Sequence, residues 1–163
     1  MRLLILTTQT PHHVRFLHVI ADRFPVMRVL EETSAVAAPF KVAHPFETER
    51  DAFEQDTWFE GREVRLEEFA PASRHQSLND DAAVSEIAAL KADATIVFGT
   101  RHLKSAVIAA AGPNLINLHG GDPESYRGLD THLWAIYHGE FADLVSTLHT
   151  VNEELDDGRI VET

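Results

Sequence analysis

Residues 94–119 read ATIVFGTRHLKSAVIAAAGPNLINLH and contain two apolar runs separated by an alanine-rich segment. The first run, ATIVFGT (94–100), is typical of a buried strand that ends at Gly99. The middle segment, 102–112, predicts a helix that Gly112 and Pro113 terminate, and LINLH (115–119) predicts a second strand. A strand, a helix and a strand in this order indicate an α/β protein with a parallel sheet.

The same alternation continues in both directions along the chain. The expected strands are 2–8, 26–32, 62–69 at an edge, 144–152 and 159–163, and the expected helices are 12–24, a partly exposed one within 33–60, 80–91 and 131–140. Residues 72–80 are expected to be a loop. The fold class is therefore a Rossmann-like three-layer sandwich, with a mostly parallel twisted sheet between helices on both faces. Ligands in such folds bind beyond the carboxyl ends of strands, so the ends of 94–100, 115–119 and 144–152 should meet.

Length, charge and cysteine content narrow the class of protein. The 163 residues suffice for a single catalytic domain over 1–163, and because the last residues read as a strand we expect the natural domain to continue. A formal net charge of −12 repels phosphate backbones, so no nucleic-acid partner is expected. No apolar run is long enough to span a membrane, and no signal peptide is recognisable, so no membrane partner is expected. The absence of cysteine fits a cytoplasmic protein, and a homodimer is left open.

Asn117 and His119 are polar residues two positions apart in an apolar strand, so their side chains leave the same face. An amide donor beside an imidazolium donor can stabilise a developing oxyanion. An acid at a neighbouring strand end, Asp156 or Asp157 in NEELDDGRI (152–160), could face His119 and accept a proton. Such a set suits acyl transfer to an amine. Spacing alone favours a structural role instead, because polar pairs at strand ends usually cap loops and acids before glycine favour turns.

The other histidines and aromatic residues receive structural interpretations. His12 and His13 open a helix and are expected at the surface, although an anion would be favoured at that helix end. His132, His138 and His149 lack the helical spacing of a metal site, and no metal is expected. Trp134 and Tyr137 are expected in the core.

The segments INLHGGDPESYRGLDTHLWAIYHGE and LHTVNEELDDGRIV resemble the catalytic half of the 10-formyltetrahydrofolate-dependent formyltransferases. That family includes phosphoribosylglycinamide formyltransferase, methionyl-tRNA formyltransferase and the sugar N-formyltransferases. Its pattern is Asn-x-His after an apolar strand, then Arg-Gly, then Leu-Asp-x-Gly about forty residues on. The matching residues here are Asn117 and His119, Arg127 and Gly128, and Leu155, Asp156 and Gly158. The resemblance is clear over 93–163 and weak over 1–92.

The resemblance implies a catalytic trio of Asn117, His119 and Asp156, with N10-formyltetrahydrofolate as formyl donor. Asn117 and His119 would bind the formyl oxygen, and Asp156 would hold the histidine and help remove the amine proton. The folate pocket would be lined, largely through backbone atoms, by two loops: Thr100, Arg101, His102 and Leu103 in the first, and Asn152, Glu153 and Leu155 in the second.

Two departures from the family pattern concern the acceptor. TTQTPHHV (7–14) replaces the family's glycine-rich first loop, and GGDPESY (120–126) replaces its Ser-Leu-Leu-Pro. By elimination, the expected acceptor is a small primary amine, most plausibly a nucleotide-linked amino sugar. The alternatives are phosphoribosylglycinamide formyltransferase activity, a folate- or nucleotide-binding α/β module without catalysis, and a metal-dependent hydrolase.

Overall fold

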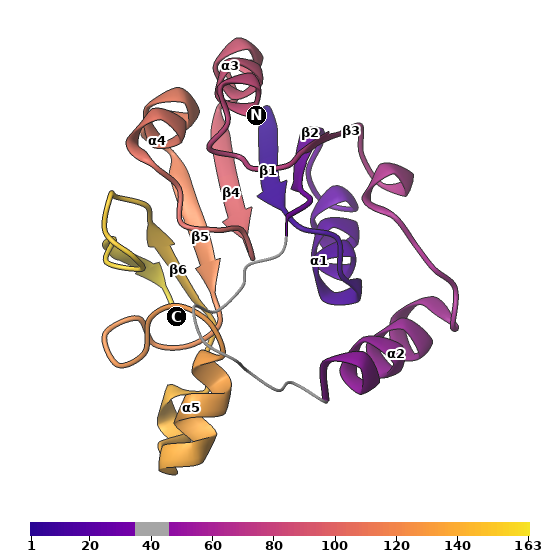
Figure 1. Ribbon diagram of the computed structural model, residues 1–163, viewed down its shortest axis with the longest axis vertical. Coiled ribbons are helices and arrows are strands. Elements are labelled where there is room, and N and C mark those ends of the chain that lie inside the picture. Colours follow the sequence, from indigo (N-terminus) through magenta and orange to yellow (C-terminus); the bar gives the residue numbers. More distant parts are fainter. Residues whose placement is uncertain (35–45) are drawn as a thin grey trace.

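The computed structural model describes residues 1–34 and 46–163 and folds these into a single seven-stranded sheet. The strands are β1 (Leu3–Thr7), β2 (Val26–Glu32), β3 (Ala72–His75), β4 (Ala94–Phe98), β5 (Leu115–His119), β6 (Thr147–Thr150) and β7 (Ile160–Glu162). Their order in the sheet is β3-β2-β1-β4-β5-β6-β7. β1 to β5 pair in parallel, whereas β6 and β7 pair antiparallel with their neighbours. Figure 1 shows β1, β4 and β5 ending at one edge, here called the carboxyl edge.

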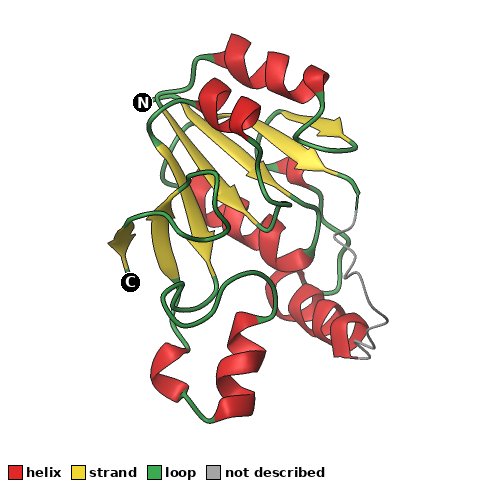
Figure 2. Ribbon diagram, turned by 60° about the vertical axis from the view of Figure 1, so that its left-hand side comes forward, coloured by secondary structure: helices red, strands yellow, loops and turns green. Residues whose placement is uncertain are grey.

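Helices cover both faces of this sheet. The α-helices of the described residues are α1 (Pro11–Ala21), α2 (Phe46–Phe59), α3 (Asp81–Leu90), α4 (Ser105–Ala111) and α5 (Thr131–His138), with short 3-10 helices at Leu66–Glu68 and Phe141–Asp143. α3 and α4 lie on one face, α1 lies on the other, and α5 extends from the carboxyl edge (Figure 2). None of the helices in the described ranges is long and apolar enough to cross a membrane.

Alternation along the strands divides the core between the two faces. Leu4 and Leu6 of β1 pack with Val97 and Leu115 beneath α3 and α4. Their neighbours Leu3 and Ile5 pack on the opposite side, against α1. Successive strand residues point to opposite faces, so a strand that is apolar throughout requires cover on both. The three-layer α/β sandwich expected from the sequence is thereby confirmed.

The prediction of an edge strand at 62–69 was wrong. The edge strand is β3, which lies within the segment 72–80 that was expected to be a loop. The backbone of 64–66 is bound by one side chain: Gln9 Nε2 donates to the Val64 carbonyl at 2.9 Å, and Leu66 N donates to Gln9 Oε1 at 3.1 Å. A segment whose polar groups are bound in this way does not need a strand partner. β3 instead pairs with β2 and is polar, with Arg74 donating to Glu31.

Two further expectations concern helices. Within 33–60 the helix occupies Phe46–Phe59 and is partly exposed as expected; residues 35–45 lie outside the described residues. Trp134 and Tyr137 were expected in the core, but they are 52% and 78% exposed on α5. Only Thr131 and Ala135 of that helix are buried. The apolar spacing of α5 therefore predicted the helix correctly and its burial wrongly.

We predict that Gln9→Ala lowers the free energy of unfolding by about 1–3 kcal/mol per buried backbone group left without a partner. Leu66 is fully buried, so water does not easily replace the lost contact. Urea denaturation measures the change. Gln55→Ala is the matched control, because Gln55 donates to the Gly61 carbonyl at an exposed site. Equal effects in the two variants would contradict this account of 64–66.

Candidate active site

Asn117 and His119 lie on β5 on the face that α3 and α4 cover. Leu115, two residues before Asn117, belongs to the core beneath those helices. Alternation places Asn117 and His119 on the same face, as expected. His119 is buried, and Asn117 pairs in register with Val97 of β4 on one side. On the other side Asn117 lies directly opposite His149 of β6.

β6 does not end where the sequence analysis placed it. It runs antiparallel to β5, with Thr147 opposite His119 and Thr150 opposite Ile116, so its end lies away from the carboxyl edge. The chain then turns back into β7, and Thr150 N donates to the Arg159 carbonyl. Gly158 makes this turn possible, because a Cβ there would lie 1.5 Å from the Thr150 carbonyl oxygen. The returning loop carries Asp156 over the face that holds Asn117 and His119.

The Asp156 carboxylate is the meeting point of the site. Asn117 Nδ2 donates to Asp156 Oδ1 at 3.3 Å, and His119 Nδ1 lies 3.6 Å from Asp156 Oδ2. Gly128 N donates to Oδ2 at 2.8 Å, which ties the Arg-Gly segment to the same carboxylate. Asp156 has a φ of 47°, in the left-handed region that aspartate tolerates better than most residues. The structure thus brings the three predicted catalytic residues together.

His149 is a member of this cluster that the sequence analysis missed. Its Nε2 lies 3.1 Å from Asn117 Nδ2 and 3.6 Å from Asp156 Oδ1, and the residue is 2% exposed. Its Nδ1–H donates to the Thr150 carbonyl at 2.8 Å, which leaves Nε2 facing the other two groups. A neutral ring accepts from Asn117 there, and a protonated ring donates to Asp156. The alternating pattern of 144–152 already indicated which face of the strand His149 lies on. It could identify His149 as a neighbour of Asn117 only once the antiparallel pairing with β5 was known.

The charges of Asp156, which is partly buried, and His149, which is buried, affect each other. Burial alone would raise the pKa of Asp156, but the hydrogen bond from His149, the Gly128 N–H and the charge of His119 hold it below its usual value. Burial alone would lower the pKa of His149, but its bonds to Asp156 and to the Thr150 carbonyl raise it. A carboxylate that stays ionised beside an imidazole that readily protonates can move a proton near neutral pH.

His119 has partners on both ring nitrogens. Nε2 lies 2.9 Å from the Tyr126 carbonyl oxygen and therefore donates to it, while Nδ1 faces Asp156. A substrate oxygen bound by His119 would replace one of these partners. Tyr126 is the last residue of the GGDPESY segment, so this segment is hydrogen-bonded directly to the His119 imidazole.

Some side chains of the two loops expected to line the folate pocket are occupied within the fold. Leu103 is buried in the core, and the Thr100 hydroxyl donates to the Arg101 carbonyl. In the second loop the Asn152 side chain accepts from Glu154 N and donates to the Asp157 carbonyl. The exposed residues among those predicted are His102, Glu153 and Leu155. The binding of folate by these two loops stays a prediction.

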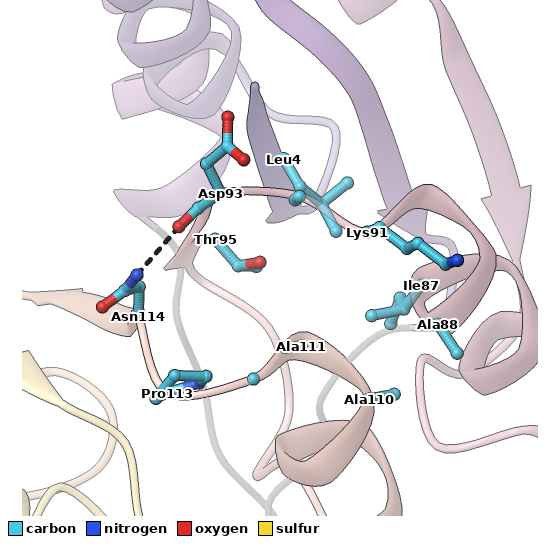
Figure 3. Close-up of a pocket in the computed structure, with 12 residues that line it drawn as sticks. Leu4, Ile87, Ala88, Lys91, Asp93, Thr95, Ala110, Ala111, Pro113 and Asn114 are labelled. Carbon is cyan, nitrogen blue, oxygen red and sulfur yellow. Dashed lines mark hydrogen bonds between the residues drawn. The ribbon is translucent and has the colours of Figure 1, made fainter. Parts of the chain in front are cut away.

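Two hollows in the surface of the described residues differ in their surroundings. One of about 360 Å³ adjoins Asp156 and is lined by Pro123, Glu124, Arg127, Asp157, Gly158, Arg159 and Ile160. The other, of about 200 Å³, lies at the amino ends of the strands, where Asn114 donates to the Asp93 carbonyl (Figure 3). The first includes Asp156 of the trio, and Arg127 pairs there with Asp157 at 2.6 Å.

Among the residues that the structure describes, metal-ligating atoms lie close together in two groups: His119, His149 and Asp156, and His12, Asp51 and Glu54. In each group a hydrogen-bond donor of the protein itself already contacts a carboxylate. The Asn117 amide points into the first, and Arg50 lies 2.9 Å from Asp51 in the second. Repulsion by these donors disfavours a cation.

His13, expected at the surface, is buried against Phe98 and Gly99. Burial, together with the neighbouring His12 and Arg50, holds its pKa well below the usual value. His12 is partly exposed and bonds Glu54 at 2.9 Å. The expectation failed because both residues open α1 in the sequence, and only the crossing of α1 over the end of β4 buries one of them.

Comparison with known proteins shows which family the chain belongs to. The model of the Formyl transferase family matches residues 4–163. A methionyl-tRNA formyltransferase from Parabacteroides distasonis is 32% identical over 91 residues, which are 56% of this chain and 28% of that protein.

Solved structures share the fold. Phosphoribosylglycinamide formyltransferase from Streptococcus pneumoniae has a TM-score of 0.64 at 16% identity, with 99% of this chain and 80% of that chain covered. The protein of that name from Bacillus halodurans has a TM-score of 0.62 at 15% identity, with 99% and 77% covered. With a family match over nearly the whole chain and a shared fold, this chain belongs to the formyl transferase family, whose enzymes use N10-formyltetrahydrofolate as formyl donor.

Proposed function

We propose that this chain transfers a formyl group from N10-formyltetrahydrofolate to a primary amine of a small acceptor. The convergence of Asn117, His119 and Asp156 carries the proposal. An amide donor and an imidazole donor lie on one strand face, and a carboxylate from a distant loop contacts both. This is an oxyanion-binding pair with an adjacent proton acceptor.

The side chains have separate tasks in this reaction. Asn117 and His119 bind the formyl oxygen as it gains negative charge, and the low-dielectric surroundings of β5 strengthen those bonds. Asp156, ionised because of its lowered pKa, takes a proton from the attacking amine. The new bond joins the amine nitrogen to the formyl carbon, the bond from that carbon to N10 breaks, and the proton passes to N10.

Glycinamide ribonucleotide is the first acceptor we propose, because several proteins of similar fold bear that activity in their names. The amino-sugar preference reached by elimination gains no support from these comparisons. One observation keeps a nucleotide-linked amino sugar as the second candidate. The Glu54 carboxylate lies 2.9 Å from His12 at the N-terminus of α1, and an acceptor phosphate bound there would have to displace it. A net charge of −12 disfavours tRNA.

His119→Ala and Asn117→Ala should each lower the rate of folate-dependent formylation by at least about 100-fold, because each removes an oxyanion donor. Steady-state release of tetrahydrofolate measures the rate. His18→Ala on α1, away from the trio, should retain the wild-type rate. An unchanged rate in His119→Ala would rule out the proposed reaction, and folate binding without turnover on a broad panel of amines would favour the non-catalytic module.

His149→Gln should cost more stability in acid than in alkali. The raised pKa of His149 contributes stability that is fully present below its unfolded-state value and is lost as pH rises through the folded-state value. The lowered pKa of Asp156 keeps the partner carboxylate ionised across that range. Denaturant unfolding of both proteins should show a larger difference at about pH 5.5 than at about pH 9. A difference independent of pH would mean that the ion pair does not form.

An acceptor screen that follows tetrahydrofolate release decides between the two candidates. We expect formylation of glycinamide ribonucleotide. Glu54→Gln should increase its use if the acceptor phosphate approaches the N-terminus of α1, because a negative charge is removed there. Reaction only with nucleotide-linked amino sugars would reverse the order of the candidates without affecting the assignment of the trio.

A further inference from the structure

Glu32 is a buried carboxylate that the reaction does not use. It ends β2, is 2% exposed, and emerges on the same face as Leu30, Asn117 and His119. Glu32 Oε2 accepts from Arg101 N at 2.8 Å, and Oε1 accepts from Leu78 N at 3.1 Å. β1 lies between β2 and β4 in the sheet, so Glu32 reaches past the end of β1 to the loop that follows β4.

Asn79 holds the same loop from the neighbouring turn. Its Oδ1 accepts from Lys104 N at 2.7 Å, and its Nδ2 donates to the His102 carbonyl at 3.1 Å. Lys104 is the N-cap residue of α4 and makes no side-chain cap of its own. Asn79 therefore binds the main chain immediately before α4 from another segment. With Glu32, it binds the main chain at three of the four positions from Arg101 to Lys104.

The chemistry of Glu32 matches this task closely. Burying a carboxylate is costly, and the cost is offset here by two charge-assisted hydrogen bonds from main-chain N–H groups. Both donors require an acceptor, and a carboxylate offers one to each. A glutamine of the same shape could accept from one N–H, but its amide NH₂ would face the other. The carboxylate is thus needed to hold Leu78 and Arg101 at once.

We propose that Glu32, assisted by Asn79, is a positioning residue of the folate site: it holds residues 100–104 in the conformation whose main-chain groups bind the formyl donor. This inference rests on the proposed function, which supplies the ligand. Glu32 does not contact Asn117, His119 or Asp156 in any described hydrogen bond or ion pair. Its effect is therefore on donor affinity, because a loosened loop must be ordered again each time the donor binds.

Glu31 is the matched control, adjacent in the same strand. It is 5% exposed, but it emerges on the opposite face and accepts from Arg74 Nε at 2.9 Å instead of holding the loop. Glu31→Gln removes a buried charge from the end of β2 as Glu32→Gln does. A general effect of that change would appear in both variants, whereas an effect on the folate loop would appear in only one.

Amide hydrogen exchange and tetrahydrofolate binding test the proposal on the full chain. In Glu32→Gln, peptides covering 76–80 and 99–105 should exchange faster, and the Kd of tetrahydrofolate should rise about 10- to 100-fold, as expected for one lost hydrogen bond to a charged group. KM for the donor should rise in parallel while kcat changes little. Glu31→Gln should leave the exchange of 99–105 and the Kd at wild-type values.

Three results would overturn the inference: faster exchange with an unchanged Kd, equal changes in both variants, or a loss confined to kcat. Should Glu32→Gln fail to fold, Asn79→Ala replaces it; this partly exposed residue binds the other end of the loop, and the same rise in Kd is expected. A wild-type protein that binds no tetrahydrofolate would contradict the proposed function itself. In that case the difference in amide exchange of 99–105 between the wild type and Glu32→Gln would still report whether Glu32 orders residues 100–104.

Discussion

β5 pairs in parallel with β4 and antiparallel with β6, and the site is assembled around this pairing. Residues directly opposite each other in a sheet share a face, so the antiparallel register places His149 beside Asn117. Alternation along β5 places His119, two residues after Asn117, on the same face. The same register sends the end of β6 away from the carboxyl edge. Asp156 lies in the loop between β6 and β7, and this loop brings its carboxylate to Asn117 and His119.

The Asp156 carboxylate then links three parts of the chain that are distant in sequence. It accepts from Asn117 on β5, from the Gly128 main chain after the GGDPESY segment, and faces His149 on β6. Its partners lower its pKa despite burial, and it raises the pKa of His149 in return. In a chain of net charge −12, several hydrogen-bond donors are thus gathered around one carboxylate.

In the proposed reaction, the acceptor and donor sides of the site are built differently. On the donor side, main-chain atoms of 100–104 are held from outside by Glu32 and Asn79. On the acceptor side, side chains fill the space: His13 is buried over Gly99, and Glu54 bonds His12 at the start of α1. A loop bound through its main chain tolerates sequence change in its side chains, whereas a surface made of side chains changes specificity with each substitution. Under the proposed function, donor binding and acceptor identity would therefore depend on different parts of the fold.

The sequence by itself determined the α/β class, the strands at 94–100 and 115–119 with their intervening helix, and the shared face of Asn117 and His119. These follow from alternation and helix-ending residues, which report local geometry. The trio came from motif spacing that resembles a known family, and the structure brings those residues together. Only the tertiary structure decided that β6 runs antiparallel, that His149 joins the cluster, that β3 replaces the strand expected at 62–69, and that Trp134 and Tyr137 are exposed. These features depend on segments far away in the chain: they are the direction of a strand, the partner of a polar side chain and the residues that cover a helix face. A local sequence pattern therefore does not predict them.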